Sequence, residues 1–69
     1  MIIEFIIKTE FGEFRSDEME VTEDQYSIIK EKSKSFYDGG YEMYLPNGFV
    51  VIPQDVVKKS ILVINIINK

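Results

Sequence analysis

The chain has 69 residues, with 8 Lys or Arg against 12 Asp or Glu, so its formal net charge is −4. It contains no His, Cys or Trp. Disulfides, thiol nucleophiles, thiolate metal sites and imidazole bases are therefore excluded from any account of its function. The length and an apolar content of 45% predict one small folded domain that spans residues 1–69.

Two strands are predicted first. Residues 2–9 alternate and are rich in β-branched and aromatic side chains, which is typical of a strand. Gly12 lies in the following turn, and residues 13–21 predict a second strand that completes a hairpin. In that strand the two glutamates at 18 and 20 fall on one face, opposite the apolar side chains at 19 and 21.

Residues 23–38 predict the main helix. Thr22 is placed to accept hydrogen bonds from the free N–H groups of the first turn, and Gln25 completes a capping box. The pair Gly39–Gly40 follows the helical pattern. We expect it to end the helix, because glycine adopts a left-handed C-cap without strain.

Three further elements are predicted after the helix. Residues 41–45 and 49–52 form a second hairpin around turn residues 46–48, and residues 53–57 begin with Pro and form one helical turn. Residues 61–67 form the last strand. The order strand–strand–helix–strand–strand–turn–strand predicts an α+β domain in which one helix crosses a face of an antiparallel sheet of about five strands.

The first and last strands are apolar on both faces, so we expect them to be central or to lie under an interface. An exposed edge at residues 61–67 would promote aggregation. We therefore expect the first strand, a second copy of the chain or another partner to cover it. A domain of this size buries only roughly 60% of the surface of its unfolded chain. Self-association into a dimer or larger homo-oligomer would supplement such a core.

The segment Gly48–Val57, followed by a strand, resembles the end of an SH3-like barrel, where a strand, a Pro-led helical turn and a closing strand follow one another. The helix between the second and third strands departs from the SH3 order. The whole short acidic chain, rich in Ile, Asn and Lys, is similar to small uncharacterised proteins of low-GC bacterial phages and prophages. That resemblance implies a setting in which genes of this size often encode inhibitors of host defence.

The acidic residues are concentrated in one part of the chain. Residues 10–24 hold seven acids and one base, Arg15, so this stretch carries −6 and the rest of the chain +2. Two interpretations remain open: a solvated face, or an acidic patch that docks on a basic partner. The residues of the docking patch would be Glu13, Asp17, Glu18, Glu20, Glu23 and Asp24.

Glu18 and Glu20, on one strand face, would lie ~6.6–6.8 Å apart. This spacing is similar to that of phosphates along a nucleic-acid strand, so mimicry of nucleic acid is geometrically open. Direct binding of nucleic acid is not expected, because phosphate contacts require Lys and Arg. The acids also lack the spacing of a calcium loop, so no metal site is expected.

Aromatic residues surround the glycine pair in residues 36–44. They belong either to the core or to a surface that binds a partner or a small ligand, a role that suits Tyr because it combines a large contact area with a polar tip. The candidates for that surface are Tyr37, Asp38, Tyr41 and Tyr44.

These observations predict a non-catalytic protein that needs no cofactor and does not bind membranes, since no apolar run approaches ~18 residues. Residues 1–8 carry Glu4 too early for a secretory signal, so a cytoplasmic location is expected, in the host if a phage encodes the chain. The function that we expect is that of a small phage-type inhibitor or accessory protein, which docks on a host protein of defence or nucleic-acid handling through the acidic patch and the aromatic residues. The alternatives are a homo-oligomeric binder of a nucleotide signal and a structural subunit of a larger assembly.

Overall fold

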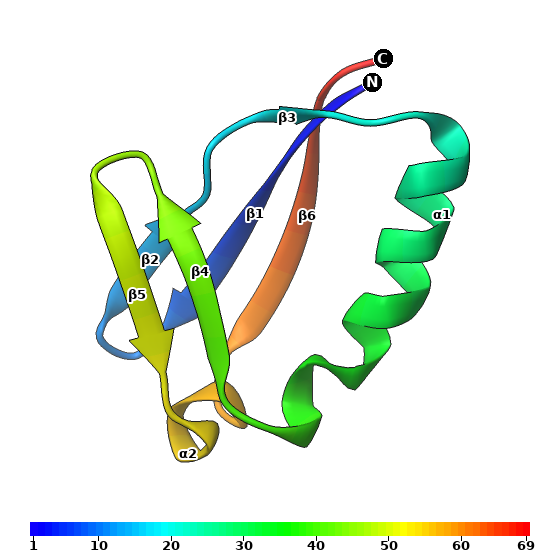
Figure 1. Ribbon diagram of the computed structural model, residues 1–69. Coiled ribbons are helices and arrows are strands. Elements are labelled where there is room, and N and C mark those ends of the chain that lie inside the picture. The colour runs from blue at the N-terminus through cyan, green and yellow to red at the C-terminus, as the bar shows by residue number, and fades with distance from the viewer.

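A computed structural model describes all 69 residues (Figure 1). The elements in chain order are β1 (Ile2–Thr9), β2 (Gly12–Arg15), β3 (Met19–Glu20), α1 (Glu23–Lys32), the 3₁₀ helix η1 (Ser33–Asp38), β4 (Tyr41–Leu45), β5 (Gly48–Ile52), α2 (Gln54–Val57) and β6 (Ile61–Asn68). The predicted α+β class, with antiparallel strands and one main helix, is confirmed.

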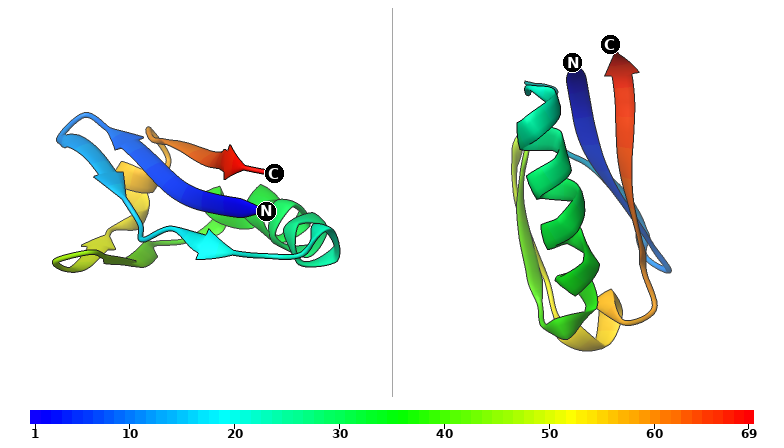
Figure 2. Two further views of the ribbon diagram at one scale, coloured as in Figure 1. Left: turned by 90° about the horizontal axis from the view of Figure 1, so that it is seen from above. Right: turned by 90° about the vertical axis from the view of Figure 1, so that its right-hand side faces the viewer.

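The strands divide between two sheets instead of the single sheet that was expected. In the larger sheet β1 is central: β2 and β3 pair with one part of it each, and β6 pairs with it over nearly its whole length. The β4–β5 hairpin forms a separate two-stranded sheet. Figure 2 shows that this hairpin and α1 lie side by side and together face the larger sheet. The helix therefore covers one part of the larger sheet and the hairpin covers another.

The core lies between these two layers. Ile3 and Ile7 of β1 and Val57 of α2 are completely buried. Phe36 from η1 and Met43 from β4 pack into the same cluster as Ile7 and Val57. By contrast, α1 contains no buried residue. The core cluster thus combines side chains from β1, η1, the β4–β5 hairpin and α2, whereas the main helix remains at its margin.

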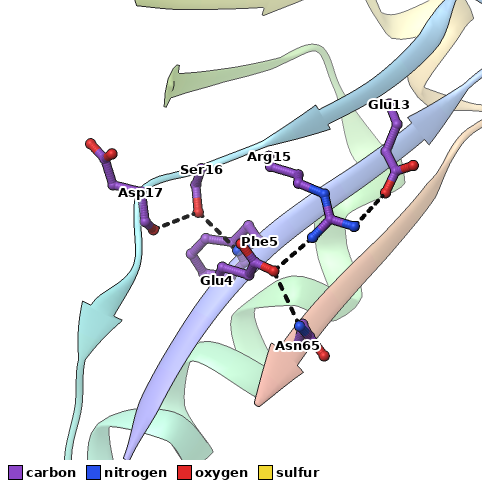
Figure 3. Close-up of polar contacts among 7 residues, drawn as sticks. All are labelled: Glu4, Phe5, Glu13, Arg15, Ser16, Asp17 and Asn65. Atoms are coloured by element: carbon purple, nitrogen blue, oxygen red, sulfur yellow. Dashed lines mark hydrogen bonds and ion pairs between the residues drawn. The ribbon is translucent and has the colours of Figure 1, made fainter. Parts of the chain in front are cut away.

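The predicted second strand is interrupted at residues 16–18 (Figure 3). Ser16 is buried, and its Oγ accepts a hydrogen bond of 2.9 Å from the backbone N–H of Phe5 while donating one of 2.9 Å to the backbone oxygen of Asp17. The side chain thus takes a position in the β ladder that a backbone carbonyl would otherwise fill. As a result the chain resumes in β3 with its register on β1 shifted by one residue relative to β2.

The predicted helix divides into α1 and η1. The expectation that a glycine in the left-handed conformation caps it is wrong. Gly39 is fully extended, with φ −167° and ψ −170°. The hydroxyls of Ser33 and Ser35 donate to backbone oxygens three residues earlier, and such local bonds compete with regular helix geometry. The absence of a side chain at Gly40 matters for a different reason, which is close packing. A Cβ there would lie 3.1 Å from the backbone oxygen of Ile52.

The C-terminal third follows the expected order. Pro53 precedes α2, and β6 follows it. However, β5 pairs only with β4, and β6 pairs only with β1, so no hydrogen-bonded ladder joins the two sheets into a closed barrel. The expectation that β1 is central is confirmed, and it covers one edge of β6. No helix in the structure has the length and apolar character needed to cross a membrane.

Candidate functional site

The predicted acidic residues follow one edge of the larger sheet and continue onto the start of α1. Glu13 lies on β2, Asp17 in the interruption, and Glu20 on β3. All six are exposed. They form an extended arrangement, which we call the acidic string: Glu13, Asp17, Glu18, Glu20, Glu23 and Asp24. No three acidic side chains lie close enough together to hold a metal ion.

Arg15 binds one member of the acidic string (Figure 3). Its Nη2 donates to Glu13 at 3.1 Å, and its Nη1 donates to Glu4 at 2.8 Å. Asn65 of β6 also donates to Glu4, at 3.1 Å, so the network joins three neighbouring strands. The other five acids of the string make no salt bridge. Their charge is available to attract a cationic partner.

The structure removes the geometric basis for phosphate mimicry by Glu18 and Glu20. Both residues were expected on one strand face, but Glu18 lies in the interruption and only Glu20 belongs to β3. The ~6.6–6.8 Å repeat applies within a regular strand. The two glutamates remain exposed members of the acidic string.

Inside the helix, Glu23 and Asp24 lie in the first turn of α1, where the positive end of the helix dipole attracts negative charge. Thr22 accepts a hydrogen bond of 3.1 Å from the backbone N–H of Gln25, whose side chain accepts one of 2.9 Å from the backbone N–H of Thr22. The predicted capping box is confirmed. It fixes the point at which the acidic string passes from sheet to helix.

The four predicted residues of the aromatic segment do not share one surface. Tyr37 donates its hydroxyl to the backbone oxygen of Ser60 at 2.8 Å, which ties η1 to the start of β6. Asp38 ends η1, and its backbone oxygen accepts a bond of 3.4 Å from Gln54. Both contacts connect η1 to the segment formed by α2 and the chain that follows it.

Tyr41 is directed toward the interior instead. Its ring packs edge-on against Phe36, with centroids 5.0 Å apart, and burial raises the pKa of Tyr41 above its usual value. It lines a cavity of about 330 Å³ between η1, β4 and the larger sheet. The side chains and backbone around that cavity come from Phe5, Ile29, Lys32, Phe36, Gly39 and Gly40, among others.

Tyr44 lies on the opposite, outer face of the hairpin and is 76% exposed. Its ring packs against Phe49, which is its direct partner in the β4–β5 ladder, with centroids 5.1 Å apart. Val51 is on the same face, since it lies two residues beyond Phe49 in β5. Phe11, in the turn between β1 and β2, is 73% exposed.

An apolar groove of about 280 Å³ connects Phe11 to Val51. Phe14, Pro53 and Val56 contribute to its walls. We call the exposed set Phe11, Tyr44, Phe49 and Val51 the aromatic surface. Exposed apolar patches that adjoin a groove are typical of interaction sites.

Acidic residues border the aromatic surface. Glu42 is the ladder partner of Val51, and Glu10 immediately precedes Phe11; both are exposed. The acidic string begins nearby, because β2 and the hairpin lie at the same end of the molecule in Figures 1 and 2. The arrangement combines an apolar centre with a negatively charged border.

Sequence reasoning missed Phe11, Phe49 and Val51, although a signal was present for Phe49 and Val51. Glu42 marks the outer face of β4, and the two-residue periodicity then places Tyr44 beside it. The short turn sets Tyr44 opposite Phe49. The position of Phe11 near Val51 depends on the packing of two hairpins. No pattern among neighbouring residues in the sequence indicated it.

No family model matches the chain, and neither a curated protein nor a solved structure shows significant similarity to it.

Proposed function

We propose that the protein is a non-catalytic protein-binding module that acts in the cytoplasm and docks on a partner through the aromatic surface and the acidic string. The observation that carries this proposal is the exposure of two packed aromatic rings, Tyr44 and Phe49, beside Val51 and the apolar groove. Aromatic side chains of this kind dominate the binding energy of many interfaces.

The charge distribution supports a basic partner. Five acids of the string are free of salt bridges, and Glu10 and Glu42 border the aromatic surface. Complementary charge increases the rate of association, while buried apolar contacts mainly set the lifetime of a complex. The resemblance of the sequence to small phage proteins favours an inhibitor or accessory protein that acts on a host defence or nucleic-acid-handling protein.

The experiment is partner capture from a cell lysate with matched variants, followed by calorimetry with the purified partner. Val51→Lys places a charge on the aromatic surface, and Ile28→Lys places the same charge on an α1 position that is 55% exposed. We expect Val51→Lys to weaken binding at least about tenfold, as for a residue near a hot spot, and Ile28→Lys to have little effect. Equal binding by the two variants would remove the aromatic surface from the proposal.

The acidic string is tested separately by Glu18→Lys with Glu20→Lys. We expect this variant to slow association and to reduce the dependence of the rate on ionic strength. An unchanged association rate would show that the string is only a solvated surface.

The cavity beside Tyr41 favours the second candidate, a binder of a small nucleotide-like ligand. Tyr41 and Phe36 offer ring surfaces, and backbone from Gly39 and Gly40 lies at the same cavity as Lys32. Its volume of about 330 Å³ falls within the usual range for ligand sites. Native mass spectrometry with a panel of common nucleotides tests this candidate: retained ligand mass would support it, and a bare chain with every nucleotide would contradict it.

A further inference from the structure

One edge of the larger sheet is unpaired along a long strand. β6 has eight residues, Ile61–Asn68, and pairs with β1 alone. Its other edge therefore presents backbone N–H and C=O groups with no neighbouring strand. Such an edge is a template for another strand.

β6 lacks the features that usually protect an edge. It contains no charged residue and no proline, and its register on β1 is regular from Ile61 to Ile66. A shift occurs only at its end, next to the pair Ile2 and Asn68. Charged side chains, prolines and central bulges are the usual means by which proteins prevent edge pairing.

The opposite edge of the sheet is protected in several of these ways. The chain there is broken between β2 and β3, and it carries Glu13, Arg15 and Glu20. The two edges thus differ in continuity and in charge. Of the two, only the β6 edge is suited to accept a strand.

The side chains of β6 are also incompletely covered. Ile61 is 59% exposed, and Ile66 and Ile67 are exposed as well. None of these large apolar side chains is fully packed within one chain, so pairing of this edge would remove apolar surface from water.

We propose that the β6 edge pairs antiparallel with the β6 edge of a second copy of the chain, which joins two sheets into one continuous sheet about a two-fold axis. An isologous contact requires that a surface complement itself. β6 meets this requirement, because it is uncharged in both halves and apolar except for Asn65 and Asn68, and therefore opposes no like charges when it is turned end for end about its centre.

Charge also favours a second copy in this arrangement. Each chain carries −4, and six of its twelve acids form the acidic string along the β2–β3 edge and the start of α1. Because β1 and β6 separate that edge from the contact, the two acidic strings occupy the outer edges of the joined sheet. Pairing of the β2–β3 edge of one copy with that of the other would instead bring like charges together.

The expected contact is modest in size. Eight residues give an edge about 27 Å long, and a sheet is about 10 Å thick, so the flat contact is on the order of 300 Å² per copy. A standard interface buries about 800 Å² of accessible surface per partner. We therefore expect a reversible dimer with a dissociation constant in the micromolar range or weaker, stabilised by salt because of the net negative charge.

A dimer of this kind would be bivalent, which adds to the proposed docking function. A dimer formed at β6 leaves Tyr44, Phe49 and Val51 of each copy on the β4–β5 hairpin, which is not part of the β6 edge. Two identical docking sites on one particle would strengthen capture of a repetitive or oligomeric partner.

Sedimentation velocity over a range of protein concentrations tests the dimer. The disrupting variant combines Ile61→Lys with Ile67→Lys, two exposed positions where lysine is compatible with the monomer fold. The matched controls are Ile28→Lys on α1 and Val51→Lys on the aromatic surface. We expect the wild type and both controls to dimerise equally, and the double variant to show a dissociation constant raised at least about tenfold, since charged residues oppose edge pairing.

Circular dichroism of each variant verifies the fold. A wild-type chain that remains monomeric at millimolar concentration would overturn the proposal, as would a folded double variant that dimerises normally. A dimer that only Val51→Lys disrupts would also overturn it. Because these readouts involve no partner, failure of the dimer is distinguishable from failure of the docking function.

Single-cysteine variants test the strand direction, since the chain contains no natural cysteine. Ile61→Cys, Val63→Cys and Asn65→Cys place thiols at successive positions on one face of β6. Antiparallel pairing brings identical positions together only near the axis, so disulfide yield should be highest at one central position and lowest at Ile61→Cys. Equal yields at all three positions would indicate parallel pairing and contradict the proposal, and so would the absence of disulfide dimers.

Discussion

At the scale of single residues, Ser16 shows how one side chain redirects a strand. Phe14 and Met19 both face the core side of the sheet, as their partners Ile7 and Ile3 do. Residues five apart in a regular strand would face opposite sides. The interruption at Ser16, with its hydrogen bonds to Phe5 and to Asp17, supplies the one-residue shift that makes both inward positions compatible.

Tyr41 leads to a prediction about pH. Burial raises the pKa of Tyr41 above the ordinary value of 10.0, because it disfavours the phenolate. As pH rises past that value the unfolded chain loses its proton first, so the folded state binds more protons and the free energy of unfolding decreases. The stabilisation is fully present below the unfolded pKa and is lost as pH rises through the folded one.

We therefore expect Tyr41→Phe to reduce the loss of stability as pH rises past about 10, measured by urea unfolding. The matched control is Tyr44→Phe, which removes an exposed phenol and should retain the wild-type loss. Identical curves for Tyr41→Phe and the wild type would contradict the assigned role of burial.

At the scale of elements, α1 depends on local interactions more than the strands do. It contains no buried residue, whereas β1 contributes the completely buried Ile3 and Ile7. Its capping box and the acids of its first turn therefore contribute a large part of the stability of this helix. A helix of this length is only marginal without tertiary packing.

Thr22→Ala tests this dependence. Removal of the cap is expected to cost about 1 kcal/mol, and the loss should appear mainly as faster hydrogen exchange in α1, with β1 amides little changed. Ser27→Ala removes a hydroxyl from the helix interior without touching the cap, and it should leave exchange in α1 unchanged or slightly slower. Equal acceleration in α1 and β1 would instead show that the helix and the sheet unfold as one unit.

At the scale of the whole molecule, the acidic string and the β6 edge lie on opposite edges of the larger sheet. The string follows the β2–β3 edge, Tyr44 and Phe49 lie on the β4–β5 hairpin, and β6 forms an uncharged edge. The proposed docking surface and the proposed dimer contact therefore lie on different parts of the molecule.

Much of the element pattern was predictable because its causes are local. The capping box at Thr22, the turn before Gly48 and the alternation in residues 2–9 each depend on neighbours a few positions away. Sequence therefore located β1, β4, β5, α2 and β6 within a few residues. The acidic residues were likewise correctly expected on the surface.

The tertiary structure decided the rest. It divided the strands between two sheets, placed Tyr41 beside a cavity and Tyr44 in solvent, and brought Phe11 to the groove beside Val51. These outcomes depend on contacts between segments far apart in the chain, which compete for the same core. Local propensity determines whether a segment is a helix or a strand. Burial and hydrogen bonding between distant segments determine its neighbours and the face that it leaves exposed.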